Sequence, residues 1–435
     1  TWFAITQRNE ARAQRVIAEQ QTENATAALD YLVSIFEIAN PATENPKTIT
    51  ALTVLERGRA KIDAELGDKP MVRARLLSAI GSVYQNLGAV SEAEPILAEA
   101  AAGPFAALDR EVRAKMEYVD ALVRLGKFEL SKELIDRTAA KIDGEKESLL
   151  PGDLDHFRMQ IAQQRANAAY WQSNFDIAID EYQKAKALCK RSPVCTPVER
   201  ASLSNNLNVA FSESGRPAEA RKELLEVKEI YLSEFGPDHL RTAVTDQNIA
   251  FADFQLGDYQ SALQDMRSVT KVFNKLLDES HPYRATASML LGRIHYSLNE
   301  NAKAVEALRA SLNSYEQSYG SAHRQVAVVS IYLALALAKD GQAAAALAAI
   351  ARAEAIYRAE YSADDPNFGD LEAHKGFVLA LSGRQVEAAA ACRRGSAQMA
   401  KTLPPDDSWL KDIAAQCAQL IAAADEGAGA ALATP

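Results

Sequence analysis

The stretch LLSAIGSVYQNLGAVSEAEP, residues 76–95, decides the fold of this chain. Gly81 allows one helix to approach the next closely, and Tyr84 fills the space between the two. Gly88 closes the turn in a left-handed conformation that other residues adopt only at a cost. Ala93 again permits close packing in the second helix. The stretch therefore predicts a pair of helices joined by a tight turn.

The same unit returns along the chain, at a fixed interval of 42 residues in its second half. Turn residues follow at Gly126, Ser173, Gly215, Gly257, Asn299, Gly341 and Gly383. An alanine stands five residues after six of these turns, at Ala178, Ala220, Ala262, Ala304, Ala346 and Ala388. Aromatic residues keep the same interval at Tyr231, Phe273, Tyr315 and Tyr357. Such self-similarity is typical of a stacked solenoid, in which no unit can bury its apolar face alone.

This pattern resembles the tetratricopeptide repeat, whose ordinary period is about 34 residues. The longer period of 42 residues resembles the variant repeats of the kinesin light chain. Loops between the repeats occupy equivalent places at 236–239, 280–282, 321–323 and 364–366. The resemblance implies an all-α fold, a right-handed α-solenoid of about eight tetratricopeptide-like helix pairs with a helical cap at each end.

The chain divides into three predicted segments. Residues 1–71 form an N-terminal helical linker or cap, and residues 72–400 form the repeat array. Residues 401–435 contain a capping helix over 408–424, followed by a frayed Ala/Gly-rich tail. The apolar residues 1–5 are either the end of a membrane helix or an ordinary helix start, and both alternatives stay open.

The composition argues against two classes of partner. The net charge is −10, the isoelectric point is near 5.3, and Lys and Arg are scattered along the chain. Nucleic acid requires a basic face that neutralises phosphates, and an acidic chain is a poor partner for anionic lipid headgroups. We therefore expect no nucleic-acid partner, and membrane contact only through a preceding transmembrane helix.

No catalytic motif stands out in the sequence. It contains no GxGxxG, GxxxxGK[ST], HExxH, GxSxG or EF-hand pattern, and no HRD or DFG of a protein kinase. We therefore expect no enzymatic activity, no catalytic residue and no cofactor in this chain.

Three of the six histidines share one position in the repeat: His239, His281 and His323. Equivalent points on adjacent packed helices lie roughly 8–10 Å apart, whereas zinc ligands lie about 2 Å from the metal. The three cannot converge on one ion, so we expect them to cap the next helix or to pack against it. The acidic pairs 364–365 and 406–407 fall in predicted turns, where aspartate forms local hydrogen bonds. We expect no metal site.

The candidate ligand surface is the inner face of the solenoid, which the first helix of each pair forms in this family. The residues assigned to it are polar or aromatic: Gln163, Asn167, Tyr170, Asn205, Asn206, Gln247, Asn248, Phe251, Arg293 and Tyr296. A carboxamide both donates and accepts, so a row of them can pair with an extended peptide backbone. We expect a protein or peptide ligand in this groove. The alternatives are a solvated face without a ligand, or asparagines that serve helix packing alone.

The four cysteines leave two arrangements open. Cys189 and Cys195 bracket a short loop, and Cys392 and Cys417 fall on neighbouring predicted helices. Two disulfides would suit an oxidising compartment, whereas four free thiols would suit the cytoplasm. Neither pair has the CxxC spacing of a zinc site.

Residues 28–88 carry a more specific resemblance, in ALDYLVSIFEIANP at 28–41, LTVLERG at 52–58 and ELGDKP at 65–70. The succession resembles the segment that joins a membrane helix to the repeats in bacterial serine/threonine kinases with C-terminal tetratricopeptide arrays. It implies a non-catalytic sensor or docking region of a bacterial signalling protein, membrane-anchored with the array outside the cytoplasm. The alternative is a free cytoplasmic scaffold or adaptor that organises a protein complex.

Overall fold

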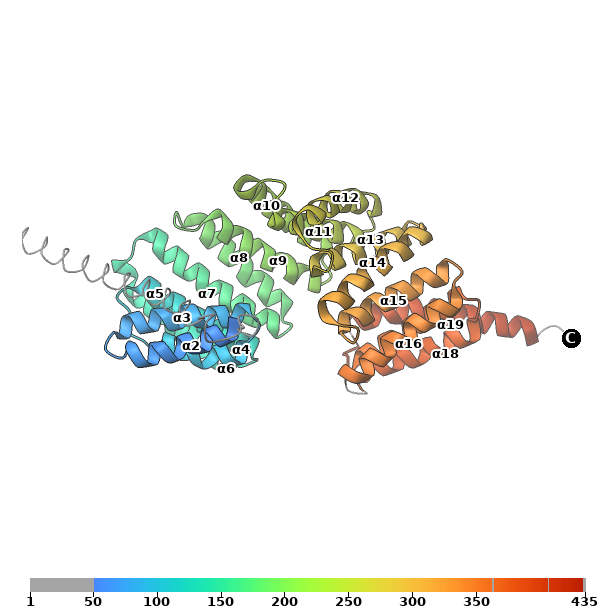
Figure 1. Ribbon diagram of the computed structural model, residues 1–435, viewed down its shortest axis with the longest axis horizontal. Helices are drawn as coiled ribbons and strands as arrows, with labels where there is room; N and C mark the ends of the chain where they lie inside the picture. Colours follow the sequence, from blue (N-terminus) through green and yellow to red (C-terminus); the bar gives the residue numbers. More distant parts are fainter. Residues whose placement is uncertain (1–50, 362–363, 406, 433–435) are drawn as a thin grey trace, which may run out of the picture. The chain divides into compact units, whose positions relative to one another are not determined.

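The computed structural model describes residues 51–361, 364–405 and 407–432, and this part of the chain is all-α (Figure 1). The possible membrane-helix end at residues 1–5 lies outside the described residues. The chain forms two compact units, which we call the N-terminal unit, ending at Ala210, and the C-terminal unit, beginning at Phe211.

Consecutive helices of the N-terminal unit pack in pairs, α3 with α4, α5 with α6 and α7 with α8. The helices are α2 (Ala51–Glu65), α3 (Pro70–Asn86), α4 (Val90–Ala101), α5 (Leu108–Arg124), α6 (Phe128–Glu145), η1 (Lys146–Ser148), α7 (Pro151–Trp171), α8 (Phe175–Arg191) and α9 (Pro197–Glu213). The last of these, α9, runs across the boundary between the two units.

The C-terminal unit continues the same arrangement, with α11 on α12, α13 on α14, α15 on α16 and α17 on α18. Its helices are α10 (Pro217–Phe235), α11 (Leu240–Gln255), α12 (Tyr259–Leu276), α13 (Pro282–Ser297), α14 (Asn301–Tyr319), α15 (Arg324–Lys339), α16 (Ala343–Glu360), α17 (Pro366–Leu381), α18 (Gln385–Met399) and α19 (Ser408–Leu432). The capping helix α19 does not end at residue 424 as expected but continues to Leu432, because its alanines favour helix. The described chain is thus a solenoid-type stack of tetratricopeptide-like helix pairs.

All eight predicted turn residues have the left-handed backbone conformation. The six glycines have φ between 71° and 82°, and the two others, Ser173 and Asn299, have φ of 60° and 61°. Glycine adopts this conformation without steric cost, and asparagine tolerates it better than most residues. The turn prediction is confirmed at every position, including the serine.

Small residues let the paired helices approach closely. The six repeated alanines at 178, 220, 262, 304, 346 and 388 are all fully buried. A Cβ atom on Gly292 of α13 would lie 2.5 Å from Cγ of Leu308 on α14, well inside contact distance. The aromatic side chains of Tyr231, Phe273, Tyr315 and Tyr357 are buried between the helices. The 42-residue pattern is therefore the pattern of the interior.

The repeated histidines begin helices. The side chains of His239, His281 and His323 accept hydrogen bonds from backbone N–H groups two residues further on, at 3.1, 3.1 and 3.2 Å. Asp365 holds the equivalent place before α17 and accepts from Asn367 N at 2.9 Å. This is N-capping, which satisfies amide groups that have no partner inside the helix. The prediction that these residues cap helices is confirmed.

Both cysteine pairs form disulfides in the structure. Cys189 at the end of α8 is linked to Cys195 in the following loop, with their Cα atoms 5.4 Å apart. Cys392 of α18 is linked to Cys417 of α19, with a Cα separation of 5.2 Å. No free cysteine remains. Among the helices that the structure describes, none combines the length and hydrophobicity needed to cross a bilayer.

Candidate functional site

The residues assigned to the inner face lie on the first helices of their pairs, but in two separate groups. Gln163, Asn167 and Tyr170 lie on α7, and Asn205 and Asn206 lie on α9, all within the N-terminal unit. Gln247, Asn248 and Phe251 on α11 and Arg293 and Tyr296 on α13 belong to the C-terminal unit. Apart from the buried Gln247, each is partly exposed. We describe the two groups one at a time.

In the N-terminal unit, Asn167 takes part in helix packing. Its Oδ1 accepts a hydrogen bond of 2.7 Å from the hydroxyl of Tyr182 on α8, and its Nδ2 donates to Oε1 of Gln164 at 3.1 Å. Burial raises the pKa of the Tyr182 hydroxyl, which therefore remains a donor. The packing alternative for the asparagines thus describes this residue, although its amide retains further hydrogen-bonding capacity.

In the C-terminal unit, Gln247 and Asn248 differ in their exposure. Gln247 is 7% exposed, and its Oε1 is buried without a hydrogen-bond partner among the described residues. Asn248 is partly exposed and has no hydrogen-bond partner in the described structure. A buried carbonyl oxygen without a donor is costly, so Gln247 can gain from a donor that reaches it.

Arg293 is surrounded by aromatic rings from the neighbouring first helices. Its Cζ lies 4.6 Å from the ring centre of Tyr332 on α15 and 4.7 Å from that of Phe254 on α11. A third ring, Phe251, lies 5.7 Å away. Cation–π contacts of this kind hold a guanidinium in place without neutralising its charge. The structure therefore brings Arg293 and Phe251 together as the shared groove assignment requires.

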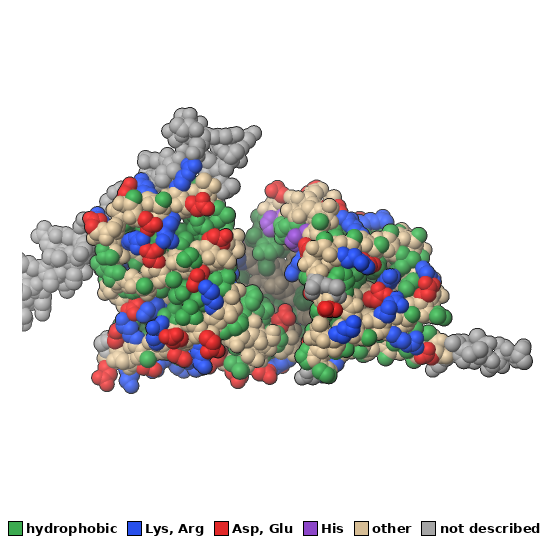
Figure 2. All heavy atoms as spheres, turned by 90° about the horizontal axis from the view of Figure 1, so that it is seen from below, with side chains coloured by type: hydrophobic (Ala, Val, Ile, Leu, Met, Phe, Trp, Pro, Cys, Tyr) green, Lys and Arg blue, Asp and Glu red, His purple; other side chains and the backbone are tan. Residues whose placement is uncertain are grey.

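The guanidinium of Arg293 has no carboxylate partner within the part of the chain that the structure describes. Most other arginines of the C-terminal unit differ, as the pair of Arg352 and Glu316 illustrates. Figure 2 shows acidic and basic side chains interspersed over the visible face of each unit. An unpaired guanidinium among aromatic rings is thus a local exception and a place where an anion can bind.

Sequence reasoning missed several members of this face. Tyr332 and His374 occupy the repeat position of Asn206 and Asn248, one or more intervals of 42 residues further on. Phe254 is the equivalent of Tyr296. The repeat interval itself could have found all three, had it been carried beyond the residues chosen for their amides.

A second group on this face joins α17 to α19. His374 Nδ1 lies 2.9 Å from the carbonyl oxygen of Asp370 and 3.3 Å from its Oδ2, and Trp409 Nε1 donates to Asp370 Oδ1 at 3.0 Å. Burial opposes a charge on His374, but the hydrogen bond and charge of Asp370 outweigh burial and raise the pKa of His374. Arg293 contributes in the opposite direction. The group is a buttress between two helices that carries a titratable side chain.

A hollow of about 520 Å³ lies elsewhere in the C-terminal unit, among residues of α16, α17 and α18. Its arginines are already paired: Arg358 Nη2 lies 2.5 Å from Glu354 Oε1, and Arg394 pairs with Glu372. Since the charges in this hollow are neutralised internally, they give it little means of selecting a charged ligand. The face around Arg293 is the better candidate.

Comparison with known proteins agrees with the repeat architecture. Residues 199–275 and 244–317 match the family model of the tetratricopeptide repeat. This chain carries a tetratricopeptide-repeat array. No catalytic family matches it, and no curated protein sequence matches the chain.

Solved structures share the fold of the array. The apo form of RapI is 12% identical with a TM-score of 0.53, covering 67% of this chain and 98% of RapI. A Rap protein complexed with competence and sporulation factor is 14% identical with a TM-score of 0.50, covering 81% and 98%. A putative kinesin light chain of Podosopora anserina with nearly identical TPR-like repeats is 22% identical, with a TM-score of 0.40 and coverage of 48% and 98%. At these identities the likeness to the Rap proteins concerns the fold alone.

Proposed function

We propose that this array is a non-catalytic binding module for a protein or peptide, held on the faces of its first helices. The observation that carries the proposal is Arg293, a guanidinium without a carboxylate partner in the described chain, oriented by three aromatic rings. A bound carboxylate would supply the missing partner, and the rings would pack against apolar side chains beside it. The ligand class that fits is a peptide segment with an acidic side chain or a free C-terminus.

The amides on the same face suit the peptide backbone of such a ligand. Asn248 and Gln247 lie on α11, the helix that also carries Phe251 and Phe254. Amide side chains pair with backbone N–H and C=O groups without reading the ligand's sequence. A solenoid of this fold has been solved in complex with the competence and sporulation factor, which is consistent with a ligand-binding role.

Selection of ligands from a displayed library of random peptides on the full chain tests the proposal. The affinities of selected peptides are then compared between wild type, Arg293→Gln and the double variant Asn206→Ala with Asn248→Ala. We expect the variants to weaken binding without lowering the melting temperature. Arg267→Gln on the exposed side of α12 removes a cation outside this face and serves as the matched control.

Three results would contradict this assignment. Peptides that bind Arg293→Gln and the double asparagine variant as tightly as wild type would place the ligand elsewhere. An equal loss with Arg267→Gln would indicate general charge attraction to the chain. Failure to select any peptide, with wild type folded, would contradict peptide recognition itself.

The finer assignment concerns the protein to which the array belongs. We propose that it is the sensor or docking region of a membrane-anchored bacterial serine/threonine kinase, with the array outside the cytoplasm. Support comes from the sequence of residues 28–88 and from the two disulfides, which suit an oxidising compartment. Mass mapping of thiols in protein purified without reductant from its native host tests the location. Four free thiols would favour the cytoplasmic scaffold.

A further inference from the structure

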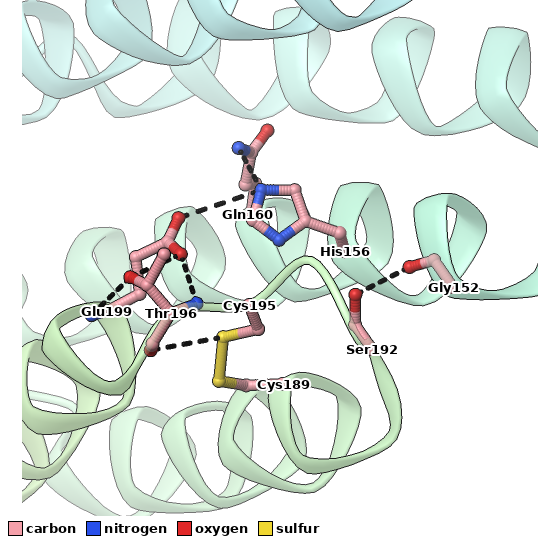
Figure 3. Close-up of a disulfide and its surroundings, with 8 residues drawn as sticks. All are labelled: Gly152, His156, Gln160, Cys189, Ser192, Cys195, Thr196 and Glu199. Carbon is pink, nitrogen blue, oxygen red and sulfur yellow. Dashed lines mark hydrogen bonds and ion pairs between the residues drawn. A yellow bond between two sulfur atoms is a disulfide. The ribbon is translucent and has the colours of Figure 1, made fainter.

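Three potential metal ligands from different parts of the N-terminal unit meet beside the Cys189–Cys195 disulfide (Figure 3). They are His156 of α7, Cys195 in the loop after α8, and Glu199 of α9. One ligand atom from each, an imidazole nitrogen, the sulfur and a carboxylate oxygen, lies within 4.8 Å of the other two. The side chains are partly exposed, so an ion could reach them from solvent.

Glu199 is held toward His156 by the start of its own helix. Its Oε2 accepts hydrogen bonds from the N–H and hydroxyl of Thr196, at 2.7 and 2.9 Å, and its N–H donates to the Thr196 hydroxyl at 3.2 Å. This reciprocal capping box fixes the carboxylate. The other oxygen, Oε1, lies 3.7 Å from His156 Nε2 and is free to serve as a ligand.

His156 is oriented but incompletely satisfied. Its Nε2 lies 3.1 Å from Nε2 of Gln160, and donation by that amide leaves the imidazole proton on Nδ1. His156 Nδ1 and Gln160 Oε1 are both buried without a hydrogen-bond partner among the described residues. Orphaned polar atoms are costly in a folded protein, so their presence here calls for a function.

The loop that carries Cys195 is tied to α7 independently of the disulfide. Ser192 Oγ donates to the carbonyl oxygen of Gly152 at 2.6 Å, and Arg191 forms two contacts with the carboxylate of Asp155, at 3.0 and 3.1 Å. These contacts would keep Cys195 close to His156 after the sulfur–sulfur bond is broken.

We propose that reduction of Cys189–Cys195 creates a zinc site formed by Cys189, Cys195, His156 Nε2 and Glu199 Oε1. A thiolate is the sulfur ligand that zinc prefers, and a disulfide sulfur does not supply one. Two thiolates, one imidazole and one carboxylate match the tetrahedral coordination of Zn²⁺. Its ligand atoms are roughly 3.3–3.8 Å apart at ordinary bond lengths, so the cluster has to contract by about 1 Å.

The chemistry balances with an external thiol as reductant. Two electrons and two protons pass to Cys189 and Cys195, their sulfur–sulfur bond breaks, and the reductant becomes a disulfide. Zinc then displaces the two thiol protons as it binds the thiolates. Oxidation and zinc therefore compete for the same sulfurs, so the site responds to both the redox state and the metal.

The test uses the full chain carrying Cys392→Ser and Cys417→Ser, which leaves a single cysteine pair. Zinc affinity is measured by competition with a chromophoric chelator, and Co²⁺ replaces zinc for absorption spectroscopy. We expect the reduced protein to bind one ion with a tetrahedral cobalt spectrum, and the oxidised protein to bind none. Each of His156→Ala and Glu199→Gln should weaken binding at least about tenfold. His239→Ala is the matched histidine control.

Any of three outcomes would overturn the site: no binding by the reduced protein, equal binding by the oxidised protein, or unchanged affinity in His156→Ala. The last would indicate an ordinary dithiol. Circular dichroism accompanies each titration. Should reduction unfold the unit, zinc must restore its helicity in the parent protein and fail to do so in His156→Ala. Absence of that restoration would equally overturn the site.

Discussion

At the scale of single residues, one alanine per repeat sets the distance between paired helices. Ala262 of α12 is fully buried, and so are its counterparts in the other repeats. A larger side chain at this position cannot be accommodated without moving one helix or forcing strained rotamers, because protein interiors are close-packed. The 42-residue recurrence of alanine is therefore a steric requirement of the helix pair.

This requirement predicts the effect of Ala262→Leu. Overpacking should lower the free energy of unfolding by about 1–3 kcal/mol, measured by urea denaturation. Gln264→Leu adds a similar side chain at an exposed position of the same helix and should change stability little. Equal effects of the two substitutions would contradict the assigned packing.

At the scale of elements, α17 and α19 are joined through Asp370, which bonds His374 on its own helix and Trp409 on the next. The His374 side chain is only 16% exposed, so its charged form depends on Asp370. Contacts of this kind make the attachment of the capping helix sensitive to pH.

We expect the protein to lose stability as pH rises above neutrality. The pKa of His374 is raised in the folded state above its ordinary value of 6.5. Its stabilising contribution is therefore fully present below that value and is lost as pH rises through the folded pKa. Melting temperatures measured between about pH 6 and about pH 9 should fall more in wild type than in His374→Gln. His239→Asn, which keeps an acceptor at the helix start, should retain the wild-type slope.

At the scale of the whole molecule, stability comes from contacts between neighbouring helix pairs. In the C-terminal unit, α19 covers the last pair through Leu410, Ile413 and Cys417, which pack against Cys392 and Met399 of α18. Terminal caps of a repeat array shield apolar surface that would otherwise face water. The loss of α19 should therefore be felt most by the helices that it touches.

A chain ending at Leu403 tests this expectation by hydrogen exchange. Protection should fall strongly in α17 and α18 and progressively less toward α11, because each repeat contacts only its neighbours. The full chain with Cys392→Ser and Cys417→Ser separates the loss of the helix from the loss of the disulfide. Uniform loss of protection across the C-terminal unit would show that it unfolds as one block.

Much of the interior could be predicted from the sequence. The turn residues Ser173 and Asn299, the buried alanines and the capping histidines all follow from spacing along the chain. Helix turns, caps and close contacts between consecutive helices are local, so they recur wherever the same residues recur. For that reason the sequence by itself determined the architecture and the repeat register.

The candidate sites depended on the tertiary structure. Arg293 meets rings from α11 and α15, and His156 meets Cys195 and Glu199 from beyond the next helix. Such encounters depend on how successive helix pairs pack and which rotamers they select, and no short-range spacing encodes either. Asn167 shows the same limit, since only its contact with Tyr182 reveals a packing role. Local periodicity determined the fold, whereas the packing of helices distant in sequence decided which side chains could act together.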